Sequence, residues 1–186
     1  MLIELSGWNN FYVMVGSAAG ALIGLQFVVL TLLAQKPRQK NSELTAAAFI
    51  APTIVHFGVT LFVSALLLVP WQMIDIPSKV LGAIGLGGIV YSCIVALRMR
   101  RQKLYIPNLW DWFYHFVIPL IAYVILTGTL FVPLLYPDEM FSGIAAATLL
   151  LLLVGIHNAW DNIAYMVLGP HNEQEYADNE TASEIQ

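Results

Sequence analysis

Several ionisable side chains of this 186-residue sequence lie inside long, otherwise uncharged stretches. A charged group at the centre of a membrane helix costs about 2.5 to 3.5 kcal/mol on insertion scales, and such residues usually mark a functional site. Five side chains of this kind have types that could act together: His56, His115, His157, Asp161 and Asp111. We therefore expect these side chains to form one polar cluster inside a helical bundle.

Four of the five form two pairs with the same spacing. Asp111 precedes His115 by four residues, and His157 precedes Asp161 by four residues. Residues four apart are neighbours on one side of a helix, so each pair should stack on a single face. The two pairs predict local hydrogen bonds between imidazole and carboxylate.

His56 belongs to a polar stripe on another apolar segment. Thr53, His56, Thr60 and Ser64 are separated by three, four and four residues, which confines them to one narrow face of a helix. Polar groups on a membrane helix avoid lipid, so this stripe should face other helices.

Imidazole and carboxylate groups without thiolates are ligands that suit zinc, iron or manganese. The sequence predicts His56, His115 and His157 as direct ligands of such a divalent metal. Ligating histidines commonly donate their second ring nitrogen to a carboxylate, which gives Asp111 that supporting role and Asp161 either that role or the place of a fourth ligand. Three histidines with an open position would activate water and permit hydrolysis of a lipid or an amide.

Other interpretations of the cluster stay open. His56 and His157 could be axial ligands of a haem, although the neighbouring aspartates and asparagines are more polar than a haem pocket needs. Chains of histidine and aspartate also form proton or ion pathways. The two pairs could be structural, or the protein could be a non-catalytic assembly protein that binds a partner through its C-terminal tail. Whether the protein is an enzyme is left open.

One resemblance to a known group of enzymes rests on these residue types. The set is similar to the zinc site of the membrane hydrolase superfamily that includes alkaline ceramidases, and its counterparts here would be Ser64, His56, Asp111, His115 and His157. That superfamily has seven spans and a closing pair of histidines, whereas this sequence closes its set with His157 and Asp161. The resemblance implies a zinc ion, and no activity is carried over from it.

The elements that must position these residues are membrane helices. Hydrophobic residues make up 59% of the chain and charged residues 11%, against roughly 25% charged in soluble proteins. A membrane helix needs about 20 apolar residues, and five segments approach or exceed that length: Phe11 to Leu33, Ala46 to Val69, Val80 to Leu97, Trp112 to Leu135 and Phe141 to Leu168. The sequence predicts an all-α, polytopic integral membrane bundle with five transmembrane helices in residues 1–169.

Basic residues give the orientation, because lysine and arginine near span ends remain in the cytoplasm. The loops after the first and third spans hold seven of the eight basic residues, and only Lys79 lies on the other side. This asymmetry predicts an outside N-terminus and a cytoplasmic C-terminus. Residues 170–186 are acidic and poor in large apolar groups, which predicts a disordered cytoplasmic tail.

Partners follow from composition and from small residues. A net charge of -4 argues against nucleic acid and leaves the lipid bilayer as the expected surrounding. Gly16, Gly20 and Gly24 are spaced by four, a pattern that serves packing within a bundle or a homo-oligomer. Short segments such as Gly-Trp-Asn-Asn and His-Asn-Ala-Trp-Asp are similar to those of small bacterial integral membrane proteins, which implies a multi-pass protein of the bacterial cytoplasmic membrane.

Overall fold

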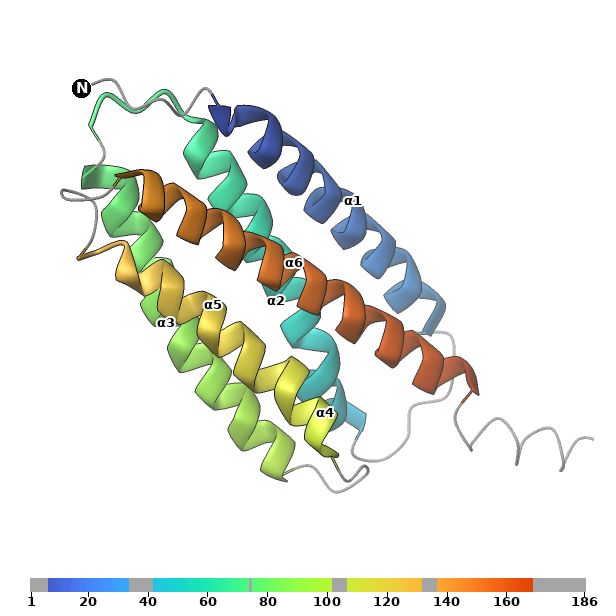
Figure 1. The fold of residues 1–186 in the computed structure, drawn as a ribbon. Coiled ribbons are helices and arrows are strands. Elements are labelled where there is room, and N and C mark those ends of the chain that lie inside the picture. Colours follow the sequence, from blue (N-terminus) through green and yellow to red (C-terminus); the bar gives the residue numbers. More distant parts are fainter. Residues whose placement is uncertain (1–6, 34–41, 74, 102–106, 132–136, 169–186) are drawn as a thin grey trace, which may run out of the picture.

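The computed structural model is a bundle of five long helical rods and describes residues 7–33, 42–73, 75–101, 107–131 and 137–168 (Figure 1). Three helices run in order as α1 (Asn9–Leu33), α2 (Ser42–Leu68) and α3 (Asp75–Arg101). The fourth rod joins α4 (Leu109–Trp112), the π-helix η2 (Phe113–Val117) and α5 (Ile118–Gly128), and the fifth is α6 (Pro137–Leu168). Five of these helical stretches are long and apolar enough to cross a membrane, which confirms the predicted all-α, five-span fold.

The ends of the rods differ from the predicted spans by a few residues, most in the third and fourth rods. α3 is longer than predicted, and its last turn carries Arg98, Arg100 and Arg101, whose charges favour a helix C-terminus. The fourth rod ends at Gly128, before the predicted end at Leu135. The next three backbone N–H groups each bond three residues back in a tight turn, starting with Thr129 to Leu126. Residues 132–135 and the predicted tail, residues 170–186, lie outside the described residues.

Four of the rods form the core of the bundle and α1 lies outside it. α2 packs against α3 and α6, and α5 completes the ring by packing against both of those helices. α1 packs mainly along α2 and more lightly along α6 (Figure 1). We call the end of the bundle at which α3 finishes with its arginines the basic end, and the end near Asn9 and Asp75 the opposite end. The predicted cytoplasmic location of the basic end stays a prediction.

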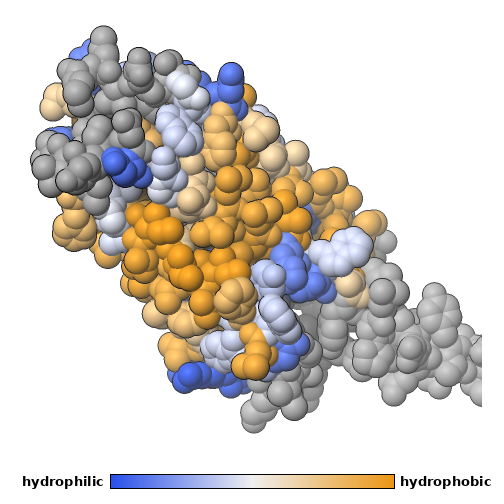
Figure 2. All heavy atoms as spheres, in the orientation of Figure 1, coloured by the Kyte–Doolittle hydropathy of each residue, from blue (hydrophilic) through white to orange (hydrophobic). Residues whose placement is uncertain are grey.

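The outer surface suits a lipid surrounding. Large apolar side chains are exposed along every rod, among them Phe27, Phe62, Val90, Val124 and Leu153. Figure 2 shows hydrophobic residues covering most of the middle of the visible face, with hydrophilic residues gathered toward its ends. A contiguous apolar belt of this kind implies contact with the acyl chains of a bilayer.

Glycines bring α3 and α5 into close contact. A Cβ atom added to Gly85 would collide with the backbone nitrogen of Thr127, and one added to Gly88 would collide with the ring of Tyr123. Small residues permit this approach in membrane bundles, where packing rather than the hydrophobic effect drives helix association. The contact positions Tyr123 in the centre of the bundle, where it is fully buried.

The predicted glycine stripe of the first span divides between two environments. A Cβ at Gly16 would lie 2.9 Å from the Cβ of Ser64 on α2, so Gly16 is a packing residue inside the bundle. Gly24 has no atom within 4 Å of such a Cβ and is exposed. Four residues turn a helix by about 40° more than one full turn, so the stripe rotates away from α2 along its length. Homo-oligomerisation through this stripe stays a prediction.

Candidate functional site

His56 forms an interhelical hydrogen bond in the middle of the bundle. The whole stripe of α2 is buried, as predicted, and His56 is 1% exposed. Its Nδ1 is 3.0 Å from the hydroxyl of Tyr123 on α5. The hydroxyl donates when the ring proton is on Nε2, and it accepts when the proton is on Nδ1. The pair can therefore pass a proton across its own hydrogen bond.

His115 is held by the π-helix of the fourth rod. Pro119 has no backbone N–H to donate to the carbonyl four residues before it, which is that of His115. Just before this proline the backbone hydrogen bonds span five residues instead of four: the N–H of Ile118 donates to the carbonyl of Phe113. π-turns of this kind often accompany functional sites. The π-turn surrounds His115, which is 3% exposed.

The backbone of the preceding turn fixes which nitrogen of His115 carries a proton. Nδ1 of His115 is 3.2 Å from the carbonyl oxygen of Asp111. A carbonyl can only accept, so Nδ1 carries the hydrogen and Nε2 of the neutral ring is an acceptor. The Nε2 atom therefore has a lone pair that can receive a proton.

The carboxylate of Asp111 does not have the predicted role beside the ring of His115. The Asp111 carboxylate accepts from the backbone N–H of Asn108 at 2.8 Å, and the Asn108 side chain accepts from the backbone N–H of Asp111 at 3.0 Å. This reciprocal arrangement is a capping box, which satisfies N–H groups that the first turn of a helix leaves unbonded. The pattern Asn-x-x-Asp is present in the sequence, but the sequence analysis paired Asp111 only with His115, as part of a metal site.

His157 and Asp161 form the predicted local pair at the basic end of α6. Nε2 of His157 is 3.0 Å from a carboxylate oxygen of Asp161, and their side chains are 37% and 49% exposed. The ring of Tyr114, next to His115, stacks on the His157 ring with centroids 3.6 Å apart. α6 ends at Leu168, so Asp161 lies about 10 Å and His157 about 16 Å from the end of the helix at 1.5 Å per residue.

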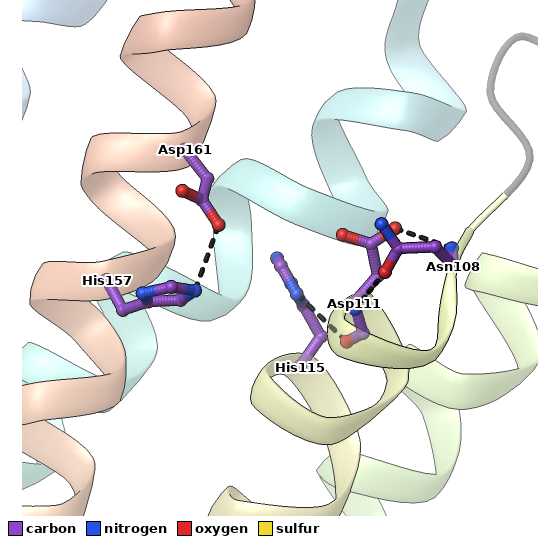
Figure 3. A network of polar contacts seen from close by, with 5 residues as sticks. All are labelled: Asn108, Asp111, His115, His157 and Asp161. Atoms are coloured by element: carbon purple, nitrogen blue, oxygen red, sulfur yellow. Dashed lines mark hydrogen bonds and ion pairs between the residues drawn. The ribbon is translucent and has the colours of Figure 1, made fainter.

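These groups converge between α6, η2 and α2. His115 lies within electrostatic range of Asp161 and His157 on one side, and of His56 on the other. Figure 3 shows the rings of His115 and His157 extending into the space between η2 and α6, with Asp161 beside His157. His56, His115 and His157 thus come from three different crossings, and their predicted role as one site stays a prediction.

The structure shows no ready-made metal-binding group in this region. Within the described ranges there is no group of three or more His, Cys, Asp or Glu side chains that could hold one metal ion. The His157 nitrogen nearest the carboxylate is already engaged with it, and His56 is bonded to Tyr123. A divalent metal on His56, His115 and His157 is therefore not supported by the structure and stays a prediction, as does a haem between His56 and His157.

Three polar residues near this region were not among the predicted site residues. Tyr123 bonds His56, Tyr91 on α3 lies within electrostatic range of Tyr123, and Asn158 on α6 is fully buried. The hydroxyl of Tyr91 and both amide atoms of Asn158 have no hydrogen-bond partner among the residues that the structure describes. The sequence offered one signal for Tyr123 and Asn158, which is a polar group in the middle of an apolar span. This signal is not specific, because many aromatic residues in such spans only pack against their neighbours.

Comparison with known proteins adds no family to this description. No protein-family model, curated protein or solved structure matches the chain. The fold and the site therefore define the class: a multi-pass helical membrane protein with five crossings and a histidine-containing polar region in its interior.

Proposed function

We propose that the protein takes up protons from its basic end into the bundle and binds them at the His56–Tyr123 pair. One observation carries this proposal: proton-accepting groups follow one another inward in order of decreasing exposure. Asp161 and His157 are partly exposed on the part of α6 toward the basic end, His115 is 3% exposed, and His56 is 1% exposed. Each member lies within hydrogen-bond or electrostatic range of the next.

The chemistry of each step is proton transfer between neighbouring lone pairs. The carboxylate of Asp161 is 49% exposed and lies 3.0 Å from the ring nitrogen Nε2 of His157, so it would take up the proton first and pass it to this ring. Histidine is the side chain that changes charge near neutral pH, and its two nitrogens allow a proton to enter on one side and leave on the other. The backbone bond from Nδ1 of His115 to Asp111 leaves Nε2 as the receiving atom. A proton that reaches His56 is then shared with the Tyr123 hydroxyl.

Nuclear magnetic resonance of ¹⁵N-labelled histidine in lipid nanodiscs tests this uptake. The chain has only four histidines, so a single-residue variant assigns each signal. We expect the ring N–H hydrogen of His56 to exchange with water at a measurable rate, because proton-accepting groups lead from Asp161 to this ring. Asp161→Asn should slow this exchange, because it removes the accepting carboxylate on α6.

His171→Gln is the control, because it removes a histidine that follows the last predicted span in the sequence. Exchange at His56 should be the same in this variant as in the original protein. Absence of measurable exchange at His56 in the original protein would overturn the proposal. Equal exchange rates in Asp161→Asn and His171→Gln would show that protons do not enter through α6.

Separate measurements decide the earlier predictions. Elemental analysis of the purified protein and of His157→Ala tests the divalent metal, and negligible metal in both would remove that prediction. The visible absorbance spectrum tests haem through its Soret band. Deletion of residues 170–186 tests an assembly role. A tail that binds a partner would be needed for function whether or not protons reach His56.

A further inference from the structure

Two hydroxyl groups follow His56 along the buried face of α2 toward the opposite end of the bundle. Thr60 is fully buried and Ser64 is 1% exposed. Neither hydroxyl, nor Nε2 of His56, has a hydrogen-bond partner among the described residues. Buried polar groups are normally bonded, because an unbonded group in an apolar interior is costly. These three groups therefore call for a hydrogen-bonding molecule along the stripe.

Two other buried hydroxyls of the bundle are bonded within their own helices. Thr148 on α6 donates to the carbonyl of Ile144 at 2.6 Å, and Ser92 on α3 donates to that of Gly88 at 2.9 Å. Serine and threonine in membrane helices have this local bond available at four residues' distance. The stripe of α2 differs from them, since Thr60 and Ser64 do not make it.

The spacing of the stripe fits a chain of single water molecules. Successive members are four residues apart, which is about 6 Å along the helix axis. One water that bonds both neighbours spans about that distance, because each such bond is about 2.8 Å long. Hydroxyls and water both donate and accept, so such a chain passes protons without a change in charge on any side chain.

α1 shields the outer part of this stripe from lipid. Gly16 lies against Ser64, and a Cβ at Gly16 would be 3.4 Å from the Ser64 hydroxyl oxygen. Tyr12 lies one turn further toward the opposite end on the same face of α1, and its buried hydroxyl donates to the carbonyl of Phe141 at 3.5 Å. Polar groups thus continue from Ser64 toward the start of α6.

We propose that Thr60 and Ser64 extend the proton path beyond His56, so that the protein conducts protons across the membrane. This proposal rests on the proposed function, because it needs protons at His56. Each step moves one proton from a donor to a neighbouring lone pair, and one proton leaves the opposite end for each that enters the basic end. No bond other than these O–H and N–H bonds forms or breaks, and the membrane potential or a pH gradient supplies the driving force.

Proton flux into liposomes tests the path. The full chain is reconstituted in vesicles of phosphatidylcholine and phosphatidylglycerol that contain a pH-sensitive dye, and valinomycin with a potassium gradient sets the membrane potential. We expect flux above that of protein-free vesicles. Thr60→Val and Ser64→Ala should each lower it at least about tenfold, a change that corresponds to a barrier increase of about 1.4 kcal/mol.

Thr148→Val is the matched control, because it removes an equally buried threonine hydroxyl that is already bonded in its own helix. Its flux should equal that of the original chain. Flux at the protein-free level in the original chain, or equal flux in Thr60→Val and Thr148→Val, would overturn the proposal. The histidine spectra and the exchange measurement at His56 in the same preparations report folding and separate the two proposals: if the His56 ring exchanges its proton with water but there is no flux, only transmembrane conduction fails.

Discussion

At the level of single residues, the hydrogen bond between His56 and Tyr123 is what connects the polar stripe of α2 to α5. Both side chains are essentially buried, and the bond joins atoms 3.0 Å apart. Interhelical hydrogen bonds in membrane proteins contribute about 0.6 kcal/mol on average, with a maximum near 1.7. The bond is therefore a modest part of stability, and its larger effect is on the orientation of the His56 ring.

Tyr123→Phe should lower the free energy of unfolding by about 0.6 to 2 kcal/mol, because it keeps the ring and leaves Nδ1 of His56 without its partner. Unfolding in mixed micelles of dodecyl maltoside and sodium dodecyl sulfate measures this change. Tyr114→Phe is the control, since Tyr114 contacts His157 through its ring face, which the substitution keeps. Equal losses in the two variants would contradict the importance of the hydroxyl.

Asp111→Ala separates the capping role of that residue from a role beside His115. We expect a loss of about 0.5 to 2 kcal/mol in unfolding free energy, the usual cost of removing a helix cap. The ¹⁵N signals of the His115 ring should stay in place, because its Nδ1 bonds the backbone carbonyl of residue 111, which alanine retains. A shift of those signals toward the other tautomer would indicate that the carboxylate acts on the ring after all.

At the level of helices, hydropathy and periodicity were sufficient to predict the number of crossings and the buried face of α2. Both follow from local pattern, since apolar length defines a span and three-to-four spacing defines a face. The partner of His56 could not be predicted, because Tyr123 reaches it only through the close contact of α3 with α5. The position of His115 depends on a π-turn, which shifts the helical register that spacing arguments assume.

Gly85→Ala should test the close contact of α3 and α5 on which the position of Tyr123 depends. The added methyl group would meet the backbone of Thr127, which cannot rotate away, so the helices must separate. Overpacking of this kind costs about 1 to 3 kcal/mol. Gly87→Ala on the same helix is the control, because its Cβ would have no atom within 4 Å.

The same micelle titration measures both alanine variants. Gly87→Ala should be neutral or slightly stabilising, since alanine favours a helix over glycine by about 0.5 to 1 kcal/mol. A destabilisation by Gly87→Ala as large as that by Gly85→Ala would mean that glycine acts through the helix itself rather than through its contact with α5.

At the level of the whole molecule, α1 stands apart from the four-helix core, and its face away from α2 carries the open part of the glycine stripe. The space beside Gly16 is filled by Ser64, whereas Gly24 is exposed and has no atom within 4 Å of an added Cβ. Any contact between two copies through this stripe must therefore use its Gly24 end. The sequence could not make this distinction, because the spacing of the three glycines is uniform.

Gly24→Leu should accordingly lower self-association without affecting the fold of a single chain. A leucine at this position would not collide with other helices of the same chain. It would prevent the close approach of a second α1, and contacts between helices through glycines require such an approach. We expect the dissociation constant between labelled copies in liposomes, measured by energy transfer, to rise at least about tenfold, which corresponds to about 1.4 kcal/mol. Phe62→Leu, an exposed position on α2, is the control. If energy transfer is the same in Gly24→Leu and Phe62→Leu, the stripe serves only the contact of Gly16 with Ser64 inside one bundle.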